Sequence, residues 1–157
     1  MTAASTPARF NTIADLAPMA GREIAASDWL AVTQAKIDEF AAATDDRQWI
    51  HVDVERAKRE APSGRTIAHG FLIVSLLAPL FENTIMVGGT SASINYGFNK
   101  LRFTGPVMSE TRIRARFTLA GYDAVQGGAQ LTWAVTIERE GEEKPALVAE
   151  WLMRRYA

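Results

Sequence analysis

Residues 67–81 form the most apolar stretch of the chain, and as a helix they would present apolar side chains in almost every direction. A surface helix carries a single apolar stripe, whereas a helix that is apolar all round belongs in the interior. Pro79 lies near the end of the stretch and lacks the backbone N–H that continues a helix, so we expect the helix to end or kink there. The rest of the chain must therefore wrap around a long central helix.

C-terminal to Gly89 the apolar residues recur at every second position, which is typical of half-buried strands. Strands are predicted over residues 92–103, 112–119, 131–137 and 146–154, with an earlier one over residues 23–32. The apolar side changes parity between Phe98 and Leu101, which predicts a bulge near Asn99 and Lys100. A curved antiparallel sheet wrapped around a buried helix fits this order of elements, so the predicted fold class is α+β.

The N-terminal third predicts two shorter helices. The first spans residues 11–19, and the second begins after Thr33 as its N-cap and runs to about residue 43. Residues 52–65 are polar and end in a loop-forming Pro-Ser-Gly sequence, so we expect a flap over a site, in which Asp53 and Glu55 open a short helix. Residues 1–9 are expected to fray, and the whole chain, 1–157, is expected to form a single domain.

Composition excludes several classes of function. The chain has 157 residues, of which 48% are hydrophobic and 22% charged, with a net charge of −1 and no run of Lys or Arg, so nucleic acid and anionic membranes are not expected partners. The absence of cysteine excludes disulfides, thiolate metal sites and cysteine nucleophiles. No apolar run reaches membrane-spanning length and no signal pattern opens the chain, so the expected location is the cytoplasm.

Residues 43–51, which read A-T-D-D-R-Q-W-I-H, contain the first candidate for catalysis. Asp45 and Asp46 lie at the carboxyl end of the predicted helix, where the dipole disfavours negative charge. A turn accepts aspartate for its local hydrogen bonds, which is the structural alternative. His51 favours a catalytic interpretation, because a carboxylate beside an imidazole fixes its tautomer and supplies a second acid or base.

Gly70 stands at the head of the apolar helix. Its backbone N–H would lie in the first turn, where it has no intrahelical partner, and such a group stabilises a developing oxyanion. Close packing or an easy helix entry is the structural alternative for a glycine at this place.

These residues resemble a known family, the MaoC-like (R)-specific enoyl-CoA hydratases of the hot-dog fold. Its pattern is T/S-G-D-x-N-P-[aliphatic]-H, followed some twenty residues later by [aliphatic]-x-H-G and an apolar helix. The matching residues are Thr44-Asp45-Asp46-Arg47-Gln48-Trp49-Ile50-His51 and Ile67-Ala68-His69-Gly70. Residues 94–107 resemble the nodulation-protein-N-like branch, whose members also carry Q-W-I-H, and the likeness runs from about residue 28 to the C terminus.

The resemblance implies a hot-dog fold and a hydro-lyase. Asp46 and His51 would form the catalytic pair that adds water to a trans-2-enoyl thioester, and the Gly70 N–H would form the oxyanion hole. Acyl-CoA would be the substrate, with coenzyme A as part of it and no separate cofactor, and the expected assembly is a homodimer or a dimer of dimers. Residues expected to line the substrate site are Gln48, Ile67, Ala68, His69, Ser75, Asn95 and Gly97.

The chain departs from the family pattern at three places. Asp45 replaces the usual glycine before the catalytic aspartate, and Gln48-Trp49 replaces Asn-Pro. Some relatives carry a serine eight residues after the H-G glycine, where this chain has Ala78.

Other functions remain open at this stage. A thioesterase on the same fold would use a carboxylate facing the helix N-terminus, and a non-catalytic acyl-thioester-binding subunit would tolerate the altered loop. A metal site built from Asp46, His51 and His69 is disfavoured, because their spacing matches no standard ligand motif.

Overall fold

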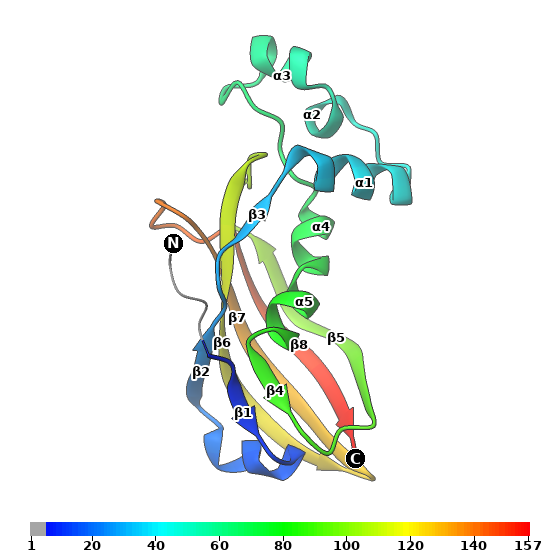
Figure 1. Cartoon of the computed structure of the whole chain (residues 1–157), viewed down its shortest axis with the longest axis vertical. Coiled ribbons are helices and arrows are strands. Elements are labelled where there is room, and N and C mark those ends of the chain that lie inside the picture. The colour runs from blue at the N-terminus through cyan, green and yellow to red at the C-terminus, as the bar shows by residue number, and fades with distance from the viewer. Residues whose placement is uncertain (1–5) are drawn as a thin grey trace.

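A computed structural model describes residues 6–157, and Figure 1 shows a curved sheet with a broken helix lying along its concave face. The six-stranded sheet has the order β2-β6-β7-β8-β5, and β3 also pairs with β6; the pairings are antiparallel. The sheet strands are β2 (Arg22–Ala26), β3 (Leu30–Val32), β5 (Ala92–Phe103), β6 (Thr111–Val125), β7 (Gly128–Arg139) and β8 (Leu147–Tyr156). The predicted α+β class is therefore confirmed.

The central helix is present, but it is divided into α4 (Gly70–Ser75) and α5 (Leu77–Glu82). The break falls at Leu76, and Pro79 explains it, since the ring of a proline clashes with the carbonyl four residues earlier, here that of Ser75. The predicted kink is thus confirmed, one turn before the proline. The helix begins at Gly70, the residue predicted to stand at its head, and residues 67–69 lie outside it, because Ile67 bridges to Met108.

Burial of the helix on every side is also a wrong prediction. Leu72, Ile73, Leu76, Leu77, Leu80 and Phe81 face the sheet and are buried. Phe71, by contrast, is 73% exposed, because the sheet covers only one side of α4 and no other described element covers the opposite side.

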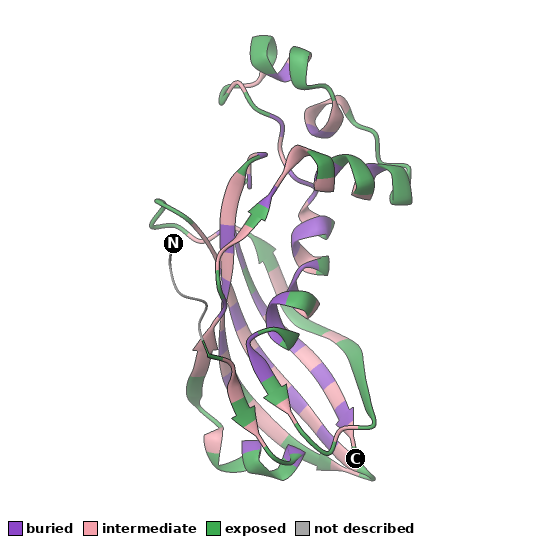
Figure 2. Cartoon of the chain, in the orientation of Figure 1, coloured by how far each residue is buried: buried purple, intermediate pink, exposed green. Residues whose placement is uncertain are grey.

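Phe81 occupies the middle of the core and is fully buried. Its ring meets Phe117, Trp133 and Trp151 edge to face, with centroid distances of 5.2, 4.9 and 5.8 Å. Edge-to-face pairs place the positive edge of one ring against the negative face of the next. Figure 2 shows the buried residues alternating along β6, β7 and β8 behind this helix, as the period of two predicted. The half-buried face predicted for β5 is not found, because no residue of β5 is buried in the single chain.

The predicted bulge in β5 is confirmed between Phe98 and Lys100, and a second register shift lies between Asn95 and Gly97. The predicted strand over residues 23–32 is interrupted, which separates β2 from β3, although both pair with β6. The 11–19 helix is the 3₁₀-helix η1 (Ile13–Met19). Two short strands, β1 (Ala8–Phe10) and β4 (Ile85–Val87), pair in parallel and were not predicted.

Residues 1–9 were expected to fray, and this prediction is wrong for Ala8 and Arg9, because their backbone pairs with β4. Residues 1–5 lie outside the described part of the chain. No helix within residues 6–157 has the length and apolar character needed to cross a membrane.

Three helices cover one end of the sheet (Figure 1): α1 (Gln34–Thr44), α2 (Trp49–Val52) and α3 (Val54–Glu60). Thr33 caps α1 as predicted, since its hydroxyl accepts the N–H of Lys36 at 3.2 Å. Asp53 caps α3 by accepting the N–H of Arg56 at 2.9 Å, so most of the expected flap is helical. This helical end carries the residues of the first motif.

We predict that Phe81→Ala lowers the free energy of unfolding by about 3–5 kcal/mol, because it removes a buried aromatic ring and leaves a cavity between three others. Urea denaturation followed by tryptophan fluorescence measures the change. Val54→Ala, at an exposed position of α3, is the control and should change the same quantity by less than about 0.5 kcal/mol. Equal effects of the two substitutions would contradict this description of the core.

Candidate active site

The turn after α1 brings Asp46 back toward the body of the protein. Asp45 ends the helix in the left-handed conformation, with φ of 60° and ψ of 12°. Glycine is the usual residue at such a helix end, and aspartate is among the few others that adopt this conformation. Asp45 therefore takes the backbone role of the glycine that the family pattern has there.

His51 lies in α2 and is only 8% exposed. Its Nδ1 lies 2.5 Å from the carbonyl oxygen of Ile67. Because a carbonyl only accepts hydrogen bonds, Nδ1 carries the proton and the lone pair is at Nε2. In this tautomer His51 is prepared to act as a base through Nε2.

His69 lies behind His51 and is 3% exposed. The two imidazole rings stack, with centroids 3.8 Å apart and planes inclined by 23°. The Nε2–H of His69 donates to the backbone carbonyl of Asp46 at 2.9 Å. One histidine ring thus contacts both members of the predicted catalytic pair.

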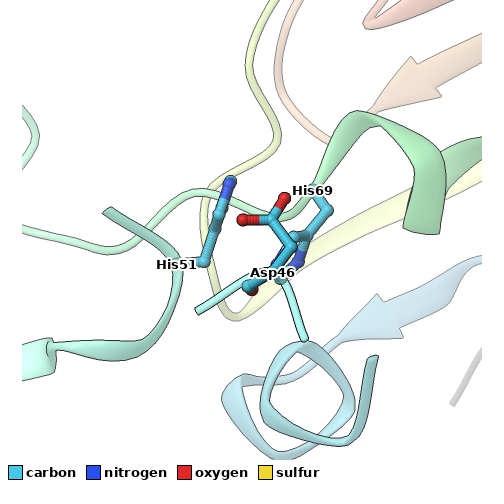
Figure 3. Close-up of side chains that lie close together, drawn as sticks. All are labelled: Asp46, His51 and His69. Carbon is cyan, nitrogen blue, oxygen red and sulfur yellow. The ribbon is translucent and has the colours of Figure 1, made fainter. Parts of the chain in front are cut away.

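Asp46 is exposed, and Figure 3 shows its carboxylate next to the rings of His51 and His69. One carboxylate oxygen and one nitrogen from each of His51 and His69 all lie within 4.8 Å of one another. A water that makes two hydrogen bonds of about 2.8 Å at a tetrahedral angle spans about 4.6 Å. The carboxylate and an imidazole are therefore close enough to share one water molecule.

The same three residues form the only candidate metal cluster within residues 6–157. The lone pair of an imidazole nitrogen lies in the plane of its ring, so a metal ion must lie near both ring planes. Two rings stacked 3.8 Å apart with a 23° inclination do not direct their lone pairs at one point. The stacked geometry does not suit a shared ion.

A cavity of about 450 Å³ opens beside His51 and extends to the start of α4. Its lining residues are His51, Ile67, Ala68, Gly70, Ile73, Phe103, Thr104, Gly105, Pro106, Val107 and Ala146. The cavity brings the two motifs together, since His51 comes from the first and residues 67–70 from the second. It has the size and mainly apolar lining of a small-molecule site.

Gly70 is the first residue of α4 and lines this cavity. A Cβ added at Gly70 would lie 2.9 Å from the ring of Phe103. Close packing therefore accounts for the glycine, and the same absence of a side chain leaves the N–H of the first helical turn unshielded. The two interpretations of Gly70 are compatible.

The remaining predicted site residues are divided among other places. Ser75 and Asn95 line a smaller cavity of about 200 Å³ on another side of α4, together with Ala78 and Trp151. Gln48 is exposed and borders neither of these cavities, and Gly97 lies at a register shift of β5.

Gln34 was missed by the sequence analysis, although it supports the site. Its Nε2 donates to the backbone carbonyl of His51 at 2.8 Å, and its Oε1 accepts the hydroxyl of Thr66. Its backbone N–H donates to a carboxylate oxygen of Glu110 at 2.8 Å. The only sequence signal is the position of Gln34 just after the N-cap Thr33, which says nothing about partners so distant in the chain.

The chain is similar to proteins of one named family. The profile described as MaoC like domain matches residues 15–140. The 3-hydroxyacyl-thioester dehydratase Z of Mycobacterium tuberculosis is 47% identical over 149 residues, which cover 94% of this chain and 98% of the relative. Nodulation protein N of Rhizobium leguminosarum bv. viciae is 42% identical over 144 residues, which cover 90% of this chain and 89% of the relative.

Among solved structures, the R-hydratase PhaJ1 from Pseudomonas aeruginosa in the unliganded form superimposes with a TM-score of 0.74. The superposition covers 92% of this chain and 85% of that chain, at 21% sequence identity. At that identity the likeness concerns the fold alone, and the expected hot-dog architecture is confirmed.

We predict that Gln34→Leu and Thr66→Val are energetically coupled. Either substitution alone leaves a polar group of the other residue without its partner, which should lower the free energy of unfolding by about 1–3 kcal/mol. The double variant should lose less than the sum of the two single variants, by about 0.5–3 kcal/mol in a urea denaturation cycle. Simple additivity would contradict the hydrogen bond between these side chains.

Proposed function

The chain belongs to the MaoC-like dehydratase family and is a hydro-lyase, and we propose that it hydrates trans-2-enoyl-CoA thioesters reversibly to (R)-3-hydroxyacyl-CoA. The observation that carries the proposal is the approach of Asp46 to His51 beside the cavity that begins at Gly70. The relative named 3-hydroxyacyl-thioester dehydratase Z supports the thioester class of the substrate.

In this proposal His51 acts as the base. Its Nδ1–H is held by the Ile67 carbonyl, so the Nε2 lone pair accepts a proton from the water that Asp46 orients. The oxygen of that water forms a bond to C3 of the enoyl group while the π electrons of the C2=C3 bond move toward the thioester oxygen. The proton that His51 took up is then delivered to C2. The reverse sequence removes water from the 3-hydroxyacyl thioester.

Charge develops on the thioester oxygen while the bond to C3 forms. The Gly70 N–H, in the first turn of α4, is suited to donate a hydrogen bond to this enolate-like oxygen. Coenzyme A is part of the substrate, so the proposed reaction needs no separate cofactor.

A second copy of the chain is the proposed partner. β5 is the last strand of the sheet, its outer edge pairs with no other strand within residues 6–157, and none of its residues is buried. Ile94, Tyr96, Phe98 and Phe103 of β5 and Phe71 of α4 are large apolar side chains that are exposed in the single chain. An exposed apolar edge strand promotes aggregation, and pairing with the edge strand of a second copy prevents it.

We predict that Asp46→Asn and His51→Ala each lower kcat about 100- to 10,000-fold, the usual worth of a positioned acid or base. The assay follows loss of the conjugated thioester absorbance of crotonyl-CoA and of a longer trans-2-enoyl-CoA, with determination of product handedness. Asp45→Asn is the matched control, because it changes the same charge in the same turn and asparagine also adopts the left-handed conformation. Its rate should stay close to that of the unaltered protein.

Two outcomes would contradict this assignment. Near-normal hydration by either Asp46→Asn or His51→Ala would remove these residues from the catalytic pair. Hydrolysis of the thioester without hydration by the unaltered protein would identify a thioesterase instead.

We predict that the protein elutes as a homodimer, or as a dimer of dimers, with at least twice the mass of one chain by light scattering. Ile94→Glu should shift it toward the monomer, because two-fold pairing along β5 would bury the new charge twice. Val54→Glu, at an exposed position of α3, is the control and should leave the mass unchanged. A monomeric unaltered protein would contradict the proposed pairing.

A further inference from the structure

We propose that His69 is a positioning residue that holds Asp46 and His51 together, through one contact with the Asp46 backbone and one with the His51 ring. This role rests on the hydration function proposed above. His69 is 3% exposed and is not among the residues that line the cavity beside His51. Its side chain contacts Asp46 and His51 and does not line the cavity in which a substrate would bind.

The first contact is a tether on the Asp46 turn. Residues 45–48 are exposed, and the other hydrogen bond of the Asp46 backbone is a long one of 3.5 Å to the hydroxyl of neighbouring Thr44. Within residues 6–157, the bond from His69 Nε2 is the one that joins the Asp46 backbone to another part of the chain. The position of the Asp46 carboxylate therefore depends on His69.

The second contact is a support for the His51 ring. The centroids of the His69 and His51 rings lie 3.8 Å apart. The ring of Phe40 contacts His69 as well, with 5.1 Å between the two centroids and an inclination of 54°. The Ile67 carbonyl fixes Nδ1 of His51 at one point only, so rotation about that bond is still open. The flat face of His69 restricts this rotation and so holds the plane of the His51 ring.

The hydrogen bonding of His69 defines its tautomer. Its Nε2 must carry a proton, because its partner is a carbonyl, and its Nδ1 is buried without a hydrogen-bond partner. The tether to Asp46 therefore needs the proton at Nε2.

Imidazole nitrogen NMR tests the tautomers without reference to catalysis, and the chain contains only two histidines. The expected spectrum near neutral pH contains one Nδ1–H ring, His51, and one Nε2–H ring, His69. In His69→Phe only the Nδ1–H signal should remain. An Nδ1–H tautomer for His69 would overturn the proposal.

Kinetics of two substitutions separate the tether from the support. His69→Phe keeps a flat ring and loses the donor to Asp46, whereas His69→Gln keeps a donor and loses the ring. Each should lower kcat about 10- to 100-fold through misplacement of the catalytic groups, with KM changed less than about threefold. A raised KM with unchanged kcat would instead make His69 a substrate contact, and unchanged values of both would overturn the proposal.

Phe40→Leu is the matched control, because it loosens the ring contact between Phe40 and His69 and leaves the contacts of His69 with Asp46 and His51. It should lower the melting temperature while kcat stays within about threefold, whereas kcat changes of equal size in all three variants would reduce the role of His69 to general packing. If the unaltered protein fails to hydrate enoyl thioesters, the proposed function fails by itself. The NMR result then still decides whether His69 holds the two residues in the stated tautomers.

Discussion

The packing of α4 and α5 into the concave face of the sheet is the contact on which the site depends. Phe81 anchors this helix among Phe117, Trp133 and Trp151, so the start of α4 has a fixed place at one end of the sheet. Gly70, which begins α4, and the cavity beside it are therefore fixed at the same end of the sheet. Because the core holds the helix, the loops around its N-terminus need few contacts of their own to reach a defined geometry.

The four residues before α4 connect the parts of the site. The hydroxyl of Thr66 reaches Gln34, the carbonyl of Ile67 holds His51, and the ring of His69 holds Asp46. The backbone N–H groups of Ile67 and Ala68 donate to the carbonyls of Ile50 and Val107, at 2.9 and 2.8 Å. This short extended segment thus ties the helical end, which carries Asp46 and His51, to the sheet and the central helix.

The residues that depart from the family pattern, Asp45, Gln48 and Trp49, form the turn between α1 and α2. Asp45 adopts the left-handed conformation that glycine usually takes, and Gln48 and Trp49 continue the turn into α2. Gln48 is the N-cap residue of α2, and the backbone N–H of His51 donates to its carbonyl at 2.9 Å. The turn therefore presents Asp46 and His51 to each other without the Asn-Pro pair that is commoner in the family.

The sequence by itself determined the fold class, the alternating buried faces of β6, β7 and β8, the N-cap at Thr33, the short helix that Asp53 opens, and the placing of Asp46 and His51 in one motif. These features follow from short-range sequence patterns, because the apolar period and the capping of helices involve residues only a few positions apart. Only the tertiary structure decided the break at Leu76, the tautomer of His51, the position of His69 and the exposure of Phe71. The tautomer of His51 and the position of His69 depend on carbonyls that are distant along the chain, those of Ile67 and Asp46. The exposure of Phe71 depends on the limited width of the sheet. A local sequence pattern does not indicate which distant groups come into contact.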